Sequence, residues 1–161
     1  MVPSRLRPAT GFNEWQKARA IAAYRAGEIG VEEEDSNRIF GVEDRKPRRV
    51  EKPWGHELWW ADTDVYAGKL LHVEAGQRLS LQLHREKDES SYLLSGRLLL
   101  TRGPSAEDLH EQEIGPGYAW RVEPEIVHCI EAVEDSVVLE VSTPHLDDVV
   151  RLQDRYGREG S

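Results

Sequence analysis

The chain has 161 residues, the length of one compact domain with a modest extension, and 39% of them are hydrophobic. This composition excludes a wholly disordered or fibrous protein, and no segment approaches the roughly 20 apolar residues that span a bilayer. The single cysteine, Cys129, excludes an intramolecular disulfide framework and a zinc site built from several cysteines. We therefore expect a cytoplasmic protein with no membrane partner.

Charge is unevenly distributed along the chain, whose net charge is −9. Residues 1–50 carry 10 Lys and Arg against 8 Asp and Glu, whereas residues 51–161 carry 11 against 22. Nucleic-acid phosphates require clustered cations on the protein that binds them. The acidic balance of the second part therefore argues against a nucleic-acid partner.

The first 50 residues contain one predicted helix and a charged connector. Asn13 and Gln16 have the spacing of a capping box, and Gly27 marks the end of the helical pattern. The apolar residues between them recur every three or four positions: Trp15, Ala18, Ile21, Ala22 and Ala26. We expect residues 1–50 to form an N-terminal extension with one short amphipathic helix, and residues 51–161 to form the main domain.

From Pro53 onward the sequence changes to short runs with period-two alternation, separated by Gly and Pro. Such runs without intervening helices predict a small antiparallel barrel or jelly roll. Apolar residues between Leu146 and Leu152 predict a short closing helix after Pro144. The predicted strands are Glu57–Trp60, Tyr66–Val73, Leu79–His84, Ser90–Leu94, Arg97–Thr101, Tyr118–Val122, His128–Val133 and Val137–Val141.

Candidate metal ligands concentrate between residues 80 and 89. Because side chains alternate along a strand, Gln82 and His84 point to the same face. A tight turn would bring Glu89 back toward this pair, and His128 opens another strand about 40 residues later. An amide oxygen, two imidazoles and a carboxylate form a suitable ligand set for a divalent metal. The alternative interpretation is that Gln82 and His84 are ordinary strand residues that face solvent.

One stretch resembles the first motif of the cupins: Gly76-x2-Leu79-Ser80-Leu81-Gln82-x-His84-x4-Glu89-x6-Gly96. Gln82 stands where most cupins have the first histidine of His-x-His, as in the type II phosphomannose isomerase branch. Three further stretches are similar to that branch: Lys52-Pro53-Trp54-Gly55, the run Lys69 to Val73, and the tail Asp147-Asp148-Val149-Val150-Arg151-x2-Asp154-x-Tyr156-Gly157-Arg158. The resemblance implies an all-β cupin fold, a small double-stranded β-helix or jelly-roll barrel, over about residues 50–158.

The resemblance also implies a function. Gln82, His84, Glu89 and His128 would hold one divalent ion, with Zn, Mn, Fe, Co and Ni all compatible. The protein would be a metal-dependent sugar or sugar-phosphate isomerase that interconverts an aldose and a ketose through an enediolate. The ion would stabilise negative charge on the sugar oxygens as a Lewis acid.

Three further residues receive roles within this hypothesis. Glu140 shares one strand face with Val138 and Ser142 and is the candidate catalytic base, or alternatively a structural hydrogen-bond partner. Lys69 is a candidate catalytic residue and substrate ligand, or alternatively a lysine that snorkels at a strand start. Arg158 would hold an anionic substrate over the barrel mouth, or alternatively belong to a disordered end.

Two other classes of function stay open. One is a cupin metalloenzyme of different chemistry, such as a lyase, an epimerase or an oxygenase, and the other is a non-catalytic sugar-binding module. Glu123 and Glu125 match positions of the second cupin motif and would place two acids beside the pocket mouth, which disfavours a phosphate ester. Because cupins are often dimers, we also expect a homodimer.

Overall fold

The computed structural model describes residues 38–39, 42–43 and 45–158. The chain divides into two compact units, Met1–Asp44 and Arg45–Ser161. In the first unit, β1 (Arg38–Ile39) pairs antiparallel with β2 (Val42–Glu43). The helix predicted between residues 13 and 27 lies outside the described residues.

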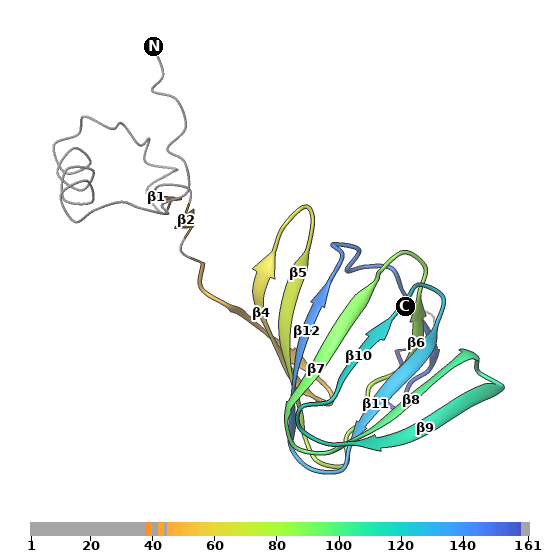
Figure 1. Cartoon of the computed structure of the whole chain (residues 1–161). Coiled ribbons are helices and arrows are strands. Elements are labelled where there is room, and N and C mark those ends of the chain that lie inside the picture. The colour runs from red at the N-terminus through yellow and green to blue at the C-terminus, as the bar shows by residue number, and fades with distance from the viewer. Residues whose placement is uncertain (1–37, 40–41, 44, 159–161) are drawn as a thin grey trace, which may run out of the picture. The chain divides into compact units, whose positions relative to one another are not determined.

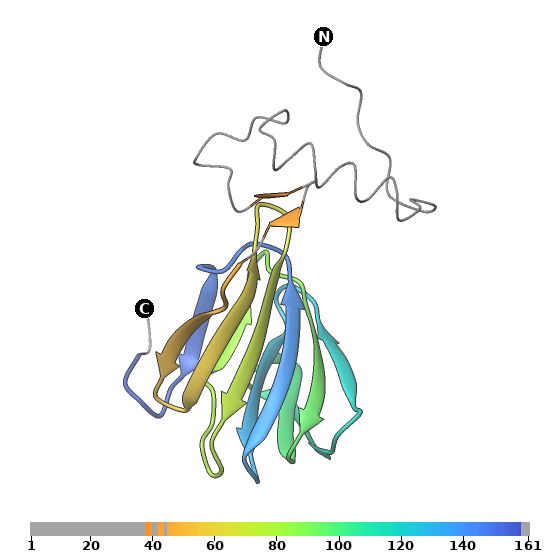
Figure 2. The ribbon, with the colours of Figure 1, turned by 90° about the vertical axis from the view of Figure 1, so that its left-hand side faces the viewer.

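The second unit is built from two antiparallel sheets that face each other (Figure 1). Its strands are β3 (Arg48–Lys52), β4 (Gly55–Asp62), β5 (Ala67–Val73), β6 (Leu81–His84), β7 (Glu89–Ser95), β8 (Leu98–Ser105), β9 (Asp108–Ile114), β10 (Ala119–Val122), β11 (Val127–Ala132), β12 (Ser136–Ser142) and β13 (Val149–Gln153). The six-stranded sheet has the order β10-β7-β12-β5-β4-β3, and the five-stranded sheet has the order β13-β6-β11-β8-β9. Figure 2 shows the six-stranded sheet toward the viewer, with β12 between β5 and β7.

The all-β fold predicted from the sequence is confirmed, because each of the eight predicted runs overlaps a strand and no helix occurs among the described residues. The prediction of a short closing helix after Pro144 was wrong. Val149 to Gln153 form β13, which pairs antiparallel with β6. The spacing of the apolar residues fits a helix, but Val149 and Val150 are β-branched and the edge of β6 offers backbone partners. Among the described residues, no helix has the length and apolar character needed to cross a membrane.

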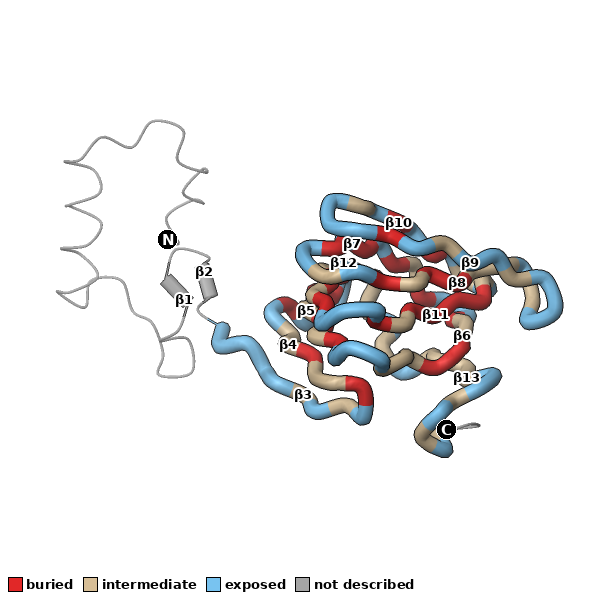
Figure 3. Tube along the Cα trace, turned by 90° about the horizontal axis from the view of Figure 1, so that it is seen from below, coloured by how far each residue is buried: buried red, intermediate tan, exposed pale blue. Residues whose placement is uncertain are grey.

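The apolar core lies between the two sheets and is formed by the inward positions of alternating strands. Buried residues concentrate along the central strands, whereas β3 and β9 at the sheet edges have mainly exposed and half-buried side chains (Figure 3). The core cluster consists of Trp54, Leu71, Val73, Leu93, Leu98, Leu100, Ile114, Trp120, Val122, Ile130, Ala132 and Val138. Elsewhere on the same inner faces the inward positions are polar, and these form the candidate site.

Gly55 is a position that the fold requires to be glycine. Its φ is +139°, a conformation that other residues rarely adopt, and a Cβ there would collide with the backbone carbonyl oxygen of His72. This close approach lets the β3–β4 turn lie against β5. The buried side chain of Trp54 then joins the core and lines the cavity described next.

Candidate metal centre and cavity

A row of inward-facing side chains crosses the six-stranded sheet. Lys69 of β5 lies opposite Trp59 of β4 on one side and Glu140 of β12 on the other. Glu140 lies opposite Ser91 of β7, and Ser91 lies opposite Trp120 of β10. Directly opposed residues in antiparallel strands share a face, so the whole row faces the five-stranded sheet. Lys69 and Glu140 are only 8% and 7% exposed, which makes them buried charges that need partners.

A cavity of about 370 Å³ lies over this row and is lined by residues of both sheets. All the candidate metal-binding, catalytic and substrate-binding residues predicted from the sequence line it: Lys69, Gln82, His84, Glu89, His128, Glu140 and Arg158. The structure thus brings together side chains that are as far as 89 positions apart in the chain.

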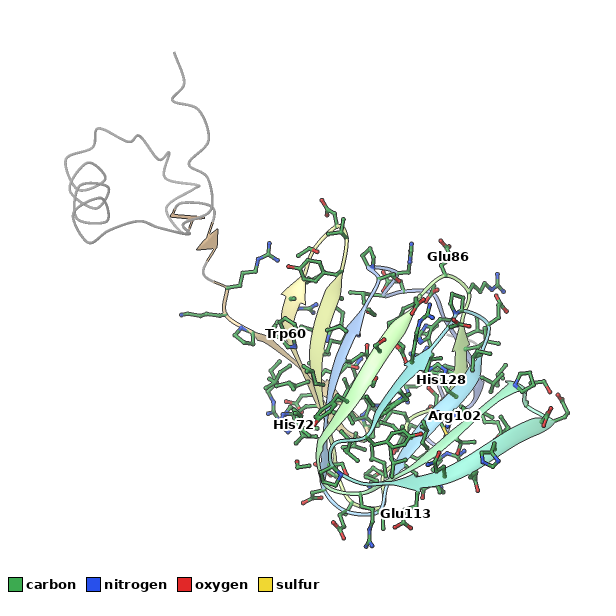
Figure 4. All side chains as sticks on the ribbon, in the orientation of Figure 1. Trp60, His72, Glu86, Arg102, Glu113 and His128 are labelled. Atoms are coloured by element: carbon green, nitrogen blue, oxygen red, sulfur yellow. The ribbon has the colours of Figure 1, made fainter. Side chains whose placement is uncertain are left out.

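Three of these residues form a group that could hold a metal ion. Ligand atoms of His84, Glu89 and His128 all lie within 4.8 Å of one another, and all three side chains are buried. The Nε2 atom of His128 lies 3.3 Å from Oε1 of Glu89, and Nε2 of His84 lies 3.9 Å from Oε2. His128, which belongs to β11, is labelled in Figure 4. Two imidazole nitrogens and one carboxylate are a donor set that fits Zn, Fe or Mn, with positions left for other ligands.

Both imidazole rings are oriented by hydrogen bonds from their other nitrogen. Nδ1 of His84 lies 2.9 Å from Oδ1 of Asp148, and Nδ1 of His128 lies 3.0 Å from the carbonyl oxygen of Ile126. Because both partners are acceptors, each Nδ1 donates its proton, and in the neutral ring Nε2 then carries the lone pair that can bind a metal ion. Carboxylate and carbonyl partners of this kind typically fix metal-binding histidines.

Gln82 lines the cavity, but its amide oxygen does not face the histidines. Oε1 of Gln82 accepts a hydrogen bond from Oγ of Ser80 at 2.7 Å, and Nε2 of Gln82 lies 3.5 Å from Nε2 of His84. The amide would have to rotate by half a turn to offer its oxygen to an ion. Gln82 as a fourth ligand therefore stays a prediction.

The electrostatics of the cluster favour a charged Glu89. Burial raises the pKa of Glu89, but its hydrogen bond with His128 and the nearby ammonium of Lys87 outweigh burial and lower that pKa. Burial lowers the pKa of His128, and the contact with Glu89 more than compensates, so this pKa is raised. The pKa of His84 is lowered, mainly by burial and then by the charge of Lys87. His84 is therefore neutral at pH 7, the state in which an imidazole binds metal.

Two residues beside the candidate ligands were missed by the sequence analysis. Lys87 is 5% exposed, and its ammonium donates to Oε2 of Glu89 at 2.5 Å and to Oε1 of Glu140 at 2.9 Å. Asp148 contacts His84 as described above. Asp148 lay within the quoted Asp147-Asp148 tail motif, which was a usable signal, whereas nothing distinguished Lys87 from the charged residues around it.

The two candidate substrate-binding cations have defined partners. The ammonium of Lys69 lies 4.4 Å above the ring of Trp59 and 3.9 Å from Oε1 of Glu140. Arg158 donates from Nε and Nη2 to the carboxylate of Asp154, at 2.9 and 2.6 Å. Arg158 is thus placed at the cavity wall by a fork of hydrogen bonds within the tail.

The two acids expected beside the pocket mouth do not form part of the cavity wall. Neither Glu123 nor Glu125 lines the cavity. Glu123 is exposed and forms an ion pair with Arg121 at 2.6 Å, and Glu125 is an exposed turn residue with φ of 68°. The described residues that line the cavity include five Lys and Arg against four Asp and Glu. The argument against a phosphate ester therefore loses its basis.

Comparison with solved structures identifies the class of fold. The chain aligns with KdgF from Halomonas sp. with a TM-score of 0.53 and 19% identity, over 63% of this chain and 89% of that one. CapF from Staphylococcus aureus, a capsular polysaccharide assembling protein, aligns with a TM-score of 0.57 and 15% identity over 69% and 34%. Oxalate decarboxylase from Bacillus subtilis, which has Mn(II) centres, aligns with a TM-score of 0.56 and 24% identity over 67% and 30%. The chain therefore has the cupin fold.

Comparison with curated proteins adds one relative. Mannose-1-phosphate guanylyltransferase of Escherichia coli (strain K12) is 31% identical over 121 residues, which is 72% of this chain and 24% of the relative. The chain thus spans about a quarter of the length of the curated relative that it matches. No family model matches the chain.

Proposed function

We propose that the protein is a metal-dependent cupin enzyme that acts on a sugar or sugar phosphate, and that it interconverts an aldose and a ketose. One observation carries the proposal: a buried His84–Glu89–His128 cluster shares a cavity with Glu140 and Lys69. Aldose–ketose isomerisation needs a base beside a group that stabilises charge on two neighbouring oxygens. The sugar-related names of CapF and of the guanylyltransferase agree with this class of substrate.

The roles of the chain's own residues follow from their positions. Glu140 removes the proton from C2 and returns it to C1, and the proton of the C2 hydroxyl passes to the C1 oxygen, so that no other reactant is consumed. Lys69, which contacts Glu140, donates to a substrate hydroxyl or phosphate. His84, Glu89 and His128, with Gln82 after rotation of its amide, hold one divalent ion, which acts as a Lewis acid when bound.

An anionic substrate agrees with the charge of the cavity. The lining already carries a small excess of cationic side chains, and a divalent ion adds two further positive charges. Arg158 is the candidate phosphate partner because it forms the tail side of the wall. A guanidinium binds phosphate through paired, charge-assisted hydrogen bonds.

The ligand assignment is tested by metal content. The purified full-length protein should bind about one divalent ion per chain, and His84→Ala and His128→Ala should each lose most of it. His110→Ala is the matched control, because His110 lies exposed on β9. Equal metal content in all three variants would refute the assignment.

The reaction is tested with the metal-loaded protein and a panel of aldoses and aldose phosphates in a coupled assay for the ketose.

One observation favours a second candidate function: two histidines and one carboxylate are the ligand set of many non-haem Fe(II) oxygenases. Oxygen consumption by the iron-loaded protein without ketose formation would favour that candidate. Saturable sugar binding without turnover would instead indicate a binding module.

The role of Arg158 is tested by Arg158→Met. We expect a raised KM for the phosphorylated substrate, a much smaller change for the free sugar, and unchanged metal content. Arg155→Met is the control, since Arg155 is exposed and pairs with Glu131, which does not line the cavity. If Arg158→Met turns over both kinds of substrate like the unmodified protein, Arg158 has no part in binding.

The homodimer and the cytoplasmic location stay predictions. Light scattering of the purified protein can test the homodimer.

A further inference from the structure

Lys87 is a buried cation to which the proposed isomerisation assigns no role. It lies in the turn between β6 and β7, and its ammonium lies between a candidate metal ligand, Glu89, and the candidate base, Glu140. A buried ammonium is tolerated only where charged partners replace its water, and here two carboxylates do so. The contact therefore fixes both carboxylates as well as the lysine.

The two oxygens of Glu89 have different partners. Oε2 accepts the hydrogen bond from Lys87 and lies 3.9 Å from Nε2 of His84, whereas Oε1 lies 3.3 Å from Nε2 of His128. While Lys87 holds Oε2, Glu89 can offer only Oε1 fully to an ion. A carboxylate held this way binds metal through one oxygen and leaves a coordination position for substrate.

Glu140 is held in a similar way. The ammonium groups of Lys87 and Lys69 lie 2.9 and 3.9 Å from the same oxygen, Oε1. Both described contacts of the Glu140 side chain therefore involve Oε1. The other oxygen, Oε2, is available to take a proton from the substrate. Lys87 thus connects the candidate base to the candidate metal ligand through a single ammonium group.

The turn that carries Lys87 is itself fixed at both ends. Oδ2 of Asp148 accepts hydrogen bonds from the backbone N–H groups of Glu86 and Lys87, at 2.7 and 2.9 Å. The backbone N–H of Asp88 donates to Oγ1 of Thr143 at 3.1 Å, and the backbone N–H of Thr143 donates to the carbonyl oxygen of Asp88 at 3.0 Å. The backbone position of Lys87 is therefore set by Asp148 and by the contacts of the turn with Thr143.

We propose that Lys87 is a positioning residue that keeps Glu89 a one-oxygen metal ligand and ties it to Glu140. The proposal rests on the metal centre of the proposed function. It adds that the coordination number of the ion depends on a residue that does not touch the ion. Without the ammonium, Glu89 is free to bind through both oxygens and to close the position that the substrate needs.

The experiment measures the visible absorption of the Co²⁺-loaded protein, which weakens several-fold when the coordination number of Co²⁺ rises from four or five to six. Lys87→Met should bind Co²⁺ with a markedly weaker band than the unmodified protein, and Lys87→Arg should restore much of the intensity. Lys52→Met is the matched control, because Lys52 lines the same cavity but its ammonium pairs with Glu57, at 3.4 Å. Its spectrum should not change.

An unchanged Co²⁺ spectrum in folded Lys87→Met would overturn the inference while leaving the metal centre intact. Failure of the unmodified protein to bind Co²⁺ would overturn the metal centre as well, so the two failures are distinguishable. Lys87→Met leaves two buried carboxylates without their shared partner, so a second variant covers the case in which it does not fold. The double variant Lys87→Met/Glu140→Gln removes one of these charges and should show the same weakened band.

Discussion

Asp148 orients one candidate ligand with one oxygen and the turn beside it with the other. Oδ1 accepts a hydrogen bond from Nδ1 of His84, and Oδ2 accepts hydrogen bonds from the backbone N–H groups of Glu86 and Lys87. Burial raises the pKa of Asp148, but the backbone hydrogen bonds of Glu86 and Lys87 and then the contact with His84 outweigh it, so the pKa is lowered. Asp148 is therefore a carboxylate at neutral pH and keeps His84 in the tautomer that binds metal.

Replacing Asp148 should weaken metal binding without removing a ligand. We expect Asp148→Asn to lower the affinity for Zn²⁺ by roughly 10-fold to 100-fold, the usual cost of losing a partner of a metal-binding histidine. Competition against a chelator of known affinity measures this. Asp147→Asn serves as the control, since Asp147 is the exposed neighbour. An affinity for Asp148→Asn equal to that of the unmodified protein would show that His84 does not need this orientation.

At the scale of single elements, β13 and the tail after it form a side wall of the cavity. β13 adds an edge strand to β6, with Val149 opposite His84 and Arg151 opposite Gln82. The following turn is closed by Asp154, which accepts hydrogen bonds from the backbone of Tyr156 and Arg158 and from the Arg158 side chain. The tail therefore brings Arg158 to the cavity although it contributes little to the core.

The Asp154–Arg158 contact gives this tail a pH dependence. The hydrogen bond from Arg158 outweighs partial burial and lowers the pKa of Asp154 from 3.8 to about 2. A lowered carboxyl pKa stabilises the folded state fully above pH 3.8 and loses this contribution as the pH falls through about 2. Asp154→Asn should therefore lower the free energy of unfolding at pH 7 by at most roughly 2 kcal/mol.

Urea unfolding at several pH values measures this effect. The difference between Asp154→Asn and the unmodified protein should shrink as the pH decreases below 3.8. Asp108→Asn, an exposed position on β9, is the control and should show no such convergence. A difference that stays constant down to the lowest pH would mean that the contact does not stabilise the folded chain.

The elements that the sequence predicted are those with clear alternation. Buried Leu71 and Val73 of β5 alternate with half-buried neighbours, and such runs identify strands and their inner face. The strands of the second unit that were missed, β3, β9 and β13, lie at sheet edges, where few side chains are buried and alternation is weak. Pairing with a neighbouring strand decides their conformation, and a single sequence does not reveal that pairing.

The residues of the candidate site also differ in whether the sequence alone predicts them. His84 and Glu89 lie within a recognisable motif and His128 opens a predicted strand, so the sequence predicts that the three side chains converge. The position of Lys87 depends on a contact with Glu140, which is 53 positions away in the chain, and the orientation of the Gln82 amide depends on a side-chain hydrogen bond from Ser80. No local pattern encodes those contacts, so only the structure locates them.

At the scale of the whole unit, the candidate metal centre joins the two sheets. Glu89 belongs to the six-stranded sheet, whereas His84 and His128 belong to the five-stranded sheet. Much of the apolar core lies elsewhere between the sheets, and the polar region is held by hydrogen bonds such as those of Lys87 and Asp148. Because the ligands converge only when both sheets are in place, an ion should bind the folded state far more tightly than the unfolded chain.

This linkage predicts the effect of metal removal on stability. Metal at 100 times its dissociation constant should stabilise the folded state by roughly 2.7 kcal/mol, so chelation should lower the melting temperature reversibly. Differential scanning calorimetry before chelation, after it and after metal is restored measures the change. His84→Ala/His128→Ala should melt at the same temperature with and without metal, because it lacks the ligands of the five-stranded sheet. An unmodified protein whose melting curve is insensitive to verified metal removal would mean that the ion does not join the two sheets.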